Sequence, residues 1–234
     1  MPRKARRKSG TGIYHVILRG INKQTIFEDD EDKRKFLENL KKYKKVSGFK
    51  LYSYCLMDNH VHLLVKESEE TVSEALKRIS SSYVYWYNMK YERIGHLFQE
   101  RFKSENVETR KYFLTVLRYI HQNPLKAGLA KDVWGSEWTS VHEYVGKAGL
   151  VDIDMGLRLF SPDRKTAIKM FIDFMEELNN DQCMDLYVRA RMSDRQVREY
   201  LLTLGVTSNS VLQRMDREDR DDVLVRLKEL NGVS

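Results

Sequence analysis

The spacing of hydrophobic and polar residues changes repeatedly between a strand-like and a helix-like period in the first half of the chain. It predicts seven elements, in the order strand, helix, strand, strand, helix, strand and helix. These elements cover residues 12–20, 29–48, 49–57, 60–66, 71–89, 98–107 and 109–123. Their order is the split β-α-β pattern of a ferredoxin-like α+β sandwich, with helices on one face of a mainly antiparallel sheet.

The ends of the predicted helices follow from capping residues and from a proline. Asp29 or Asp30 can cap the first helix, and Gly48 follows that helix in the usual C-terminal position. Thr109 can cap the third helix. We expect that helix to end at Asn123, because the residue before a proline disfavours the helical region.

A second pattern begins near residue 160, where turn-rich sequence gives way to helical segments. These cover residues 167–178, 184–191, 194–204 and 210–230. Residues 194–215 have the outline of a helix-turn-helix, although small structural bundles have the same outline. The sequence thus predicts three parts: a flexible basic arm at 1–10, a catalytic domain at 11–155 and a helical domain at 160–234 that contributes DNA recognition or dimer contacts.

Charge is unevenly distributed along the chain. The protein has 41 lysines and arginines against 34 aspartates and glutamates, and the first 160 residues hold 29 of the former and 20 of the latter. This excess favours a polyanion partner, because neutralising phosphates releases counterions. Five cations lie within the first eight residues, with no acidic residue before Glu28, and we expect them to contact phosphates without reading sequence. They are Arg3, Lys4, Arg6, Arg7 and Lys8.

Composition excludes several classes of protein. No apolar run approaches the roughly 18–20 residues that a membrane span needs, so we expect no integral membrane protein. The apolar stretch behind the basic N-terminus is too short for a secretory signal. Cys55 and Cys183 lie far apart, outside any zinc-binding spacing. We therefore expect a cytoplasmic, nucleoid-associated protein.

Two histidines in the third predicted strand form a candidate metal site. His60 and His62 are two residues apart, so on a strand both side chains point to one face and could reach one metal ion. The alternative is a pair of polar residues at the mouth of a hairpin. A polar stripe on the helix before Pro124 could supply the remaining chemistry. It contains Tyr112, Thr115, Tyr119 and Asn123.

Three separated motifs resemble one known family. They are MDNHVH at 57–62, GHLFQERFK at 95–103 and LRYIHQNPLKAGL at 117–129. The first matches the His-hydrophobic-His signature of the HUH nucleases, and the last is similar to the catalytic-tyrosine helix of single-tyrosine transposases. The nearest branch is that of the transposases associated with repetitive extragenic palindromic (REP) elements. The resemblance covers roughly residues 10–145.

The resemblance implies a role for each matching residue. His60 and His62 would bind Mg²⁺ or Mn²⁺, with Asn123 as third ligand where related transposases often have glutamine. Tyr119 would attack the scissile phosphate, leaving a 5′-phosphotyrosine and a free 3′-hydroxyl. The expected activity is that of a metal-dependent endonuclease and strand transferase acting on single-stranded DNA at hairpin-flanked sites. Related enzymes act as monomers or dimers, which leaves a homodimer open.

Several alternatives remain at this point. A non-catalytic regulator could keep the fold and bind DNA hairpins, and a metal phosphohydrolase could use the histidines without a covalent step. Tyr112 is a second candidate nucleophile, and His15 could support the site or be an ordinary strand histidine. Arg101 and Lys103, on alternate positions of a predicted strand, are candidate phosphate contacts. The aromatic residues left for stacking on unpaired bases are Tyr85 and Tyr91.

Overall fold

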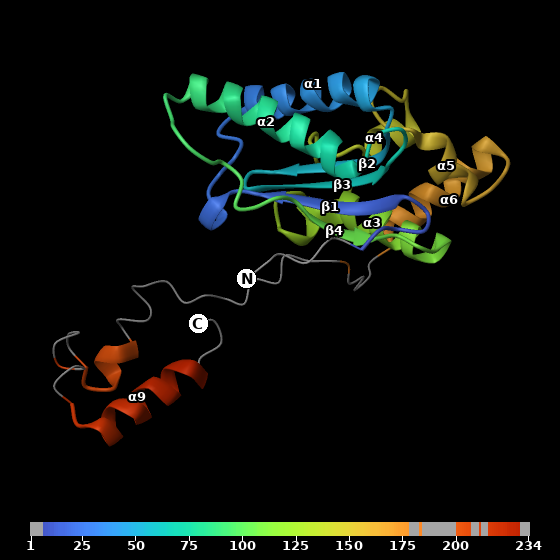
Figure 1. The fold of residues 1–234 in the computed structure, drawn as a ribbon. Coiled ribbons are helices and arrows are strands. Elements are labelled where there is room, and N and C mark those ends of the chain that lie inside the picture. The colour runs from blue at the N-terminus through green and yellow to red at the C-terminus, as the bar shows by residue number, and fades with distance from the viewer. Residues whose placement is uncertain (1–6, 178–182, 184–199, 207–210, 212–214, 230–234) are drawn as a thin grey trace. The chain divides into compact units, whose positions relative to one another are not determined.

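A four-stranded antiparallel sheet forms the centre of the first part of the chain (Figure 1). Its strands are β1 (Ile13–Arg19), β2 (Lys50–Met57), β3 (His60–Lys66) and β4 (Lys103–Asn106). The computed structural model describes residues 7–177, 183, 200–206, 211 and 215–229. The spatial order β2-β3-β1-β4 is that of the ferredoxin-like α+β sandwich expected from the sequence.

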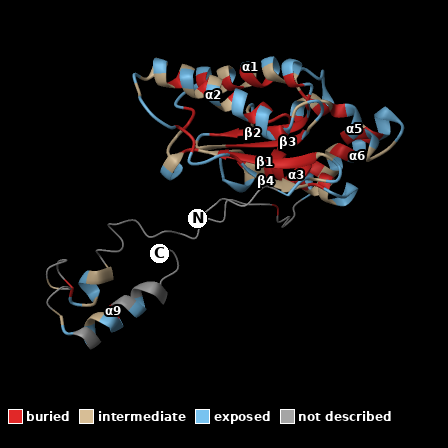
Figure 2. Cartoon of the chain, viewed as in Figure 1, coloured by how far each residue is buried: buried red, intermediate tan, exposed pale blue. Residues whose placement is uncertain are grey.

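Helices cover both faces of this sheet. The three long helices are α1 (Asp30–Ser47), α2 (Val72–Lys90) and α3 (Arg110–Lys126). Figure 1 shows α1 and α2 on one face and α3 on the other. The expectation of helices on one face was therefore wrong. Strands β1 and β3 are buried at nearly every position, so each face presents apolar side chains that need cover (Figure 2).

The helix ends confirm the capping predictions, with one exception. Asp29 caps α1 in a capping box with Asp32, and Gly48 ends that helix at a φ of 66°. Thr109 caps α3, but this helix continues through Pro124 to Lys126. A proline in the last turn removes one hydrogen-bond donor, while the N–H of Ala127 still donates to the carbonyl oxygen of Asn123. Asn123 therefore lies within the helix.

Strand β4 is shorter than the sequence predicts. Phe98 forms an isolated bridge with Gly20, and Lys103 pairs with Ile17. Lys103 follows Phe98 by five residues, whereas their partners Ile17 and Gly20 are only three residues apart. The two extra residues make the segment leave the sheet. Arg101 lies in this irregular stretch, so the expectation that it shares a strand with Lys103 was wrong.

The first compact unit extends beyond the predicted boundary at residue 160 and runs to Met184. Short helices complete it: η1 (Ile21–Lys23), α4 (Val141–Val145), α5 (Ile153–Arg158) and α6 (Arg164–Glu176). Phe171 of α6 is fully buried and stacks on Tyr144 of α4, with ring centroids 4.6 Å apart. This packing holds α6 in the first unit, although the charge pattern changes before it.

The second compact unit comprises Asp185–Ser234. Its described part includes α9 (Arg217–Glu229) and a small apolar cluster around Val206 and Val223. Most of the predicted helix-turn-helix at 194–215 lies outside the described residues. Across the ranges that are described, no helix combines the length and the apolar character needed to cross a membrane.

Candidate active site

The two histidines of β3 lie on the sheet face that α3 covers. Their ring centroids are 4.9 Å apart, while Val61 between them is fully buried in the opposite layer. His60 is half-buried, and its Nδ1 lies 2.6 Å from Oδ1 of Asn59. Because an amide oxygen accepts hydrogen bonds, the proton of a neutral His60 belongs on Nδ1. The lone pair of His60 is then on Nε2.

Helix α3 brings the other two predicted residues to the same place. Asn123 lies one turn after Tyr119, so the two side chains share a helix face. Nδ2 of Asn123 is 3.4 Å from Nε2 of His62. The ring of the buried Tyr119 meets that of His62 edge to face, with centroids 5.6 Å apart. His62, Tyr119 and Asn123 are thus in mutual reach.

Two further residues contact this cluster: His15, which was expected to support the site or to be an ordinary strand histidine, and Lys126, which the sequence pattern did not single out. Nε2 of His15 on β1 lies 3.1 Å from Nδ1 of His62. Nζ of Lys126 lies 5.4 Å from the centre of the Tyr119 ring. Lys126 comes seven residues after Tyr119, so extending the polar stripe by one turn would have found it. The contact of His15 depends on strand register, which the sequence pattern does not give.

The inner histidines are electrically neutral at neutral pH. Burial lowers the pKa of His15 to about 3. Burial, followed by the nearby His60 and His15, also lowers the pKa of His62 well below its ordinary value. A neutral imidazole keeps a lone pair, which is what ligation of a metal requires.

The donor atoms fit a divalent metal ion with an incomplete protein ligand set. Where the structure describes the chain, no three His, Cys, Asp or Glu side chains are grouped to hold a metal. Two imidazole nitrogens and an amide oxygen are the remaining candidates, from His60, His62 and Asn123. The amide nitrogen of Asn123 faces His62, and a half-turn of this amide would present its oxygen instead. Such a set leaves positions for phosphate oxygens and water.

Among the described residues, the predicted phosphate contacts are not all gathered in one place. Arg3, Lys4 and Arg6 lie outside the described residues. Arg7 and Lys8 are exposed, and the chain here runs beside β4, where Nδ2 of Asn106 donates to the carbonyl oxygen of Lys8.

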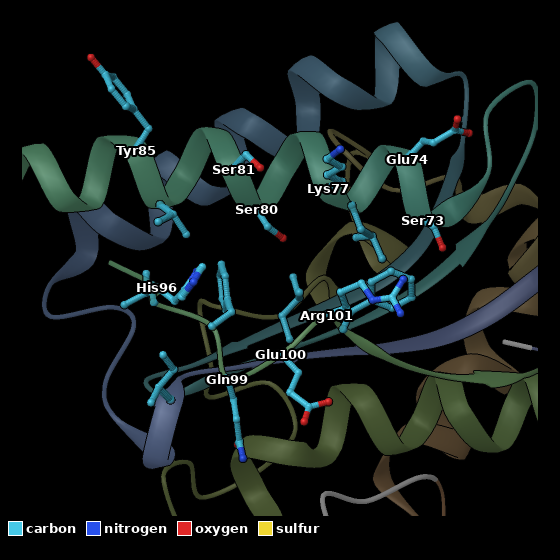
Figure 3. Close-up of a pocket in the computed structure, with 17 residues that line it drawn as sticks. Ser73, Glu74, Lys77, Ser80, Ser81, Tyr85, His96, Gln99, Glu100 and Arg101 are labelled. Atoms are coloured by element: carbon cyan, nitrogen blue, oxygen red, sulfur yellow. The ribbon is translucent and has the colours of Figure 1, made fainter. Parts of the chain in front are cut away.

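Arg101 and Lys103 lie in different surroundings. Lys103 is exposed on β4 and pairs with Ile17, whose side chain shares the sheet face of His62. Arg101 lines a hollow of about 960 Å³ between α2 and residues 96–102 (Figure 3). Leu18, from the opposite face of β1, also lines this hollow. The structure therefore separates the two cations.

The remaining tyrosine candidates differ in what they contact. Tyr85 is 71% exposed and turned away from the hollow in Figure 3. The hydroxyl of Tyr91 donates to Asp32 of α1. The hydroxyl of Tyr112 donates to Glu105, and burial together with this hydrogen bond raises the pKa of Tyr112. Tyr112 is thus held in its protonated form, which is unfavourable for a nucleophile.

Comparison with known proteins finds a similar family and a similar fold. Residues 9–123 match the family described as "Transposase IS200 like". The fold resembles the solved structure of a REP-associated tyrosine transposase bound to a REP hairpin, with a TM-score of 0.55 and 16% identity over 66% of this chain and 96% of that chain.

A second solved structure, a candidate transposase from Deinococcus radiodurans R1, has 16% identity and a TM-score of 0.37 over 52% of this chain and 97% of that chain. None of the curated proteins matches this chain. The match over residues 9–123 shows that this part of the chain is similar to the IS200-like transposase family.

Proposed function

We propose that this protein is a transposase, a metal-dependent endonuclease and strand transferase that acts on single-stranded DNA at hairpin-flanked sites. The observation that carries the proposal is the contact between the Tyr119 ring and His62, whose Nε2 faces Asn123. A phenol is thereby held beside a set of neutral metal ligands. This combination suits attack on a phosphodiester whose charge a metal ion offsets.

The reaction has three tasks, which are nucleophilic attack, metal binding and stabilisation of negative charge, and different residues of the site perform them. The Tyr119 oxygen attacks phosphorus and loses its proton, and the 3′ oxygen of the upstream strand leaves and gains one. His60, His62 and Asn123 would hold Mg²⁺ or Mn²⁺, which would polarise the phosphate. The ammonium group of Lys126 is close enough to the Tyr119 ring to favour the negative charge that develops on the phenol oxygen.

The product of cleavage keeps the energy of the broken bond. The 5′ phosphate of the downstream strand is joined to Tyr119, and the upstream strand ends in a free 3′-hydroxyl. A 3′-hydroxyl that later attacks this phosphotyrosine restores a phosphodiester and frees the tyrosine. Strand transfer therefore needs no ATP.

Hairpin DNA is the proposed partner for two reasons. The solved REP-associated transposase with the similar fold is bound to a REP hairpin. This chain also has an excess of positive charge in its first 160 residues, which includes the cations at positions 3–8. Phosphate contacts of that kind provide affinity for DNA of any sequence, while recognition of a hairpin needs further contacts.

The test uses single-stranded DNA that carries a hairpin and its flanks, labelled at either end. With Mg²⁺ or Mn²⁺, a 3′-labelled strand should become covalently attached to the protein on a denaturing gel, and a 5′-labelled strand should be shortened but stay free. Duplex DNA of the same sequence is the control. Cleavage without an adduct would favour a phosphohydrolase, and binding without cleavage would favour the regulator.

A further inference from the structure

His15 is a buried histidine to which the proposed reaction assigns no task. It lies on β1 opposite Leu64, one diagonal step from His62 on the same face of the sheet. Its side chain is inaccessible to solvent, and its ring stacks on that of His62 with centroids 5.3 Å apart. Nε2 of His15 and Nδ1 of His62 are 3.1 Å apart, which is hydrogen-bonding distance.

Two arrangements of one proton satisfy this contact. Either Nε2–H of His15 donates to His62, or Nδ1–H of His62 donates to His15. A neutral imidazole carries a single ring proton, so the first arrangement places the proton of His62 on Nε2 and the second leaves a lone pair there. A metal ion beside Asn123 can be bound by Nε2 of His62 in the second arrangement alone.

The other neighbour of His62 favours the second arrangement in the metal-free protein, where the Asn123 amide turns its nitrogen toward His62. Nδ2 of Asn123, an amide donor, lies 3.4 Å from Nε2 of His62. A lone pair on Nε2 accepts from this amide, and the Nδ1–H then donates to His15. Within the described residues, Nδ1 of His15 has no hydrogen-bond partner in either arrangement, so it favours neither.

His15 also contacts the residue proposed as the nucleophile. The rings of His15 and Tyr119 meet edge to face, with centroids 5.8 Å apart. His15, His62 and Tyr119 therefore form a closed triangle of ring contacts. Because His15 lies on β1, a central strand of the sheet, its ring limits the movement of the His62 and Tyr119 rings together.

We propose that His15 is a positioning residue, which accepts the Nδ1–H of His62 and thereby presents the Nε2 lone pair of His62 to the metal ion. This inference rests on the proposed function. Hydrogen bonds to the second nitrogen of a ligating histidine fix its tautomer, and their loss commonly weakens metal binding about 10–100-fold. His15 supplies that bond without adding charge, since it is neutral.

The first experiment measures Mn²⁺ affinity of the full-length protein without DNA, by electron paramagnetic resonance. His15→Phe keeps a ring but removes the acceptor, and we expect it to weaken Mn²⁺ binding about 10–100-fold. His15→Gln restores an acceptor and should recover most of the loss. His121→Phe is the matched control, because His121 is also fully buried and its Nε2 lies 2.8 Å from Oγ of Ser140, while its Nδ1 has no hydrogen-bond partner among the described residues.

The second experiment needs no variant. Long-range ¹⁵N–¹H correlation spectra of the metal-free wild type should show the proton of His62 on Nδ1. A proton on Nε2, or unchanged Mn²⁺ binding in His15→Phe, would overturn the inference and leave the proposed function standing. A wild type that binds no Mn²⁺ would instead contradict the proposed function, while the spectrum would still test the hydrogen bond.

Discussion

Mild acid should destabilise this protein because it buries neutral histidines. His15 and His121 are fully buried, and burial lowers the pKa of each to about 3. In the unfolded chain both pKa values return to about 6.5. Between these two values the unfolded state binds more protons than the native state. The free energy of unfolding must therefore fall as the pH is lowered through this window.

The size of the effect follows from the two pKa values. Between pH 7.5 and 5.5 each unfolded histidine goes from about 10% to about 90% protonated, while the native one stays neutral. Each therefore lowers the free energy of unfolding by about 1.4 kcal/mol over this range. The two together contribute about 3 kcal/mol. His62, whose pKa burial also lowers, adds to the loss in the same direction.

Urea unfolding at the two pH values measures this difference. The three tryptophans, Trp86, Trp134 and Trp138, all lie in the first unit and report its unfolding by fluorescence. His121→Phe removes one titrating group, so its loss between pH 7.5 and 5.5 should be smaller than that of wild type by about 1.4 kcal/mol. Equal losses in the two proteins would refute the argument from burial.

Three other changes test separate parts of the account. Asn123→Ala keeps the nucleophile but removes a proposed ligand, so adduct formation should need at least about tenfold more Mn²⁺; an unchanged metal titration would argue against ligation. Deleting residues 1–8 removes five positive charges and should weaken binding of all DNA sequences alike in filter-binding assays, with a flatter salt dependence; a loss confined to the hairpin would mean that the arm reads sequence. Val61→Ala should lower the free energy of unfolding by about 2 kcal/mol in urea, because this fully buried side chain leaves a cavity; a loss below about 0.5 kcal/mol would contradict its place in the core.

The fold could be predicted largely because local signals agree along the chain. Asp29 and Thr109 lie where the structure begins a helix, and Gly48 lies where it ends one. Local rules failed where tertiary structure outweighed them. Pro124 is accommodated in the last turn of α3, and two extra residues after Phe98 shorten β4, which spacing alone does not reveal.

The candidate site was predictable only as far as it depends on local spacing along the chain. His60 and His62 share a face because of strand alternation, and Tyr119 and Asn123 share one because of helical spacing. The two pairs meet because α3 packs on the sheet, and the residue spacing does not show this packing. His15 could not be assigned from its own surroundings in the sequence, because its contact with His62 depends on the register of β1 against β3.

The identity of the nucleophile is the central claim, and one gel tests it most directly. The assay incubates 3′-labelled, hairpin-bearing single-stranded DNA with Mn²⁺ and wild type, Tyr119→Phe or Tyr112→Phe, and separates the products under denaturing conditions. Tyr119→Phe removes one oxygen but keeps the ring that packs against His62, so folding should persist while the covalent adduct disappears. Tyr112→Phe should still form the adduct. An adduct that survives in Tyr119→Phe and is lost in Tyr112→Phe would contradict the account.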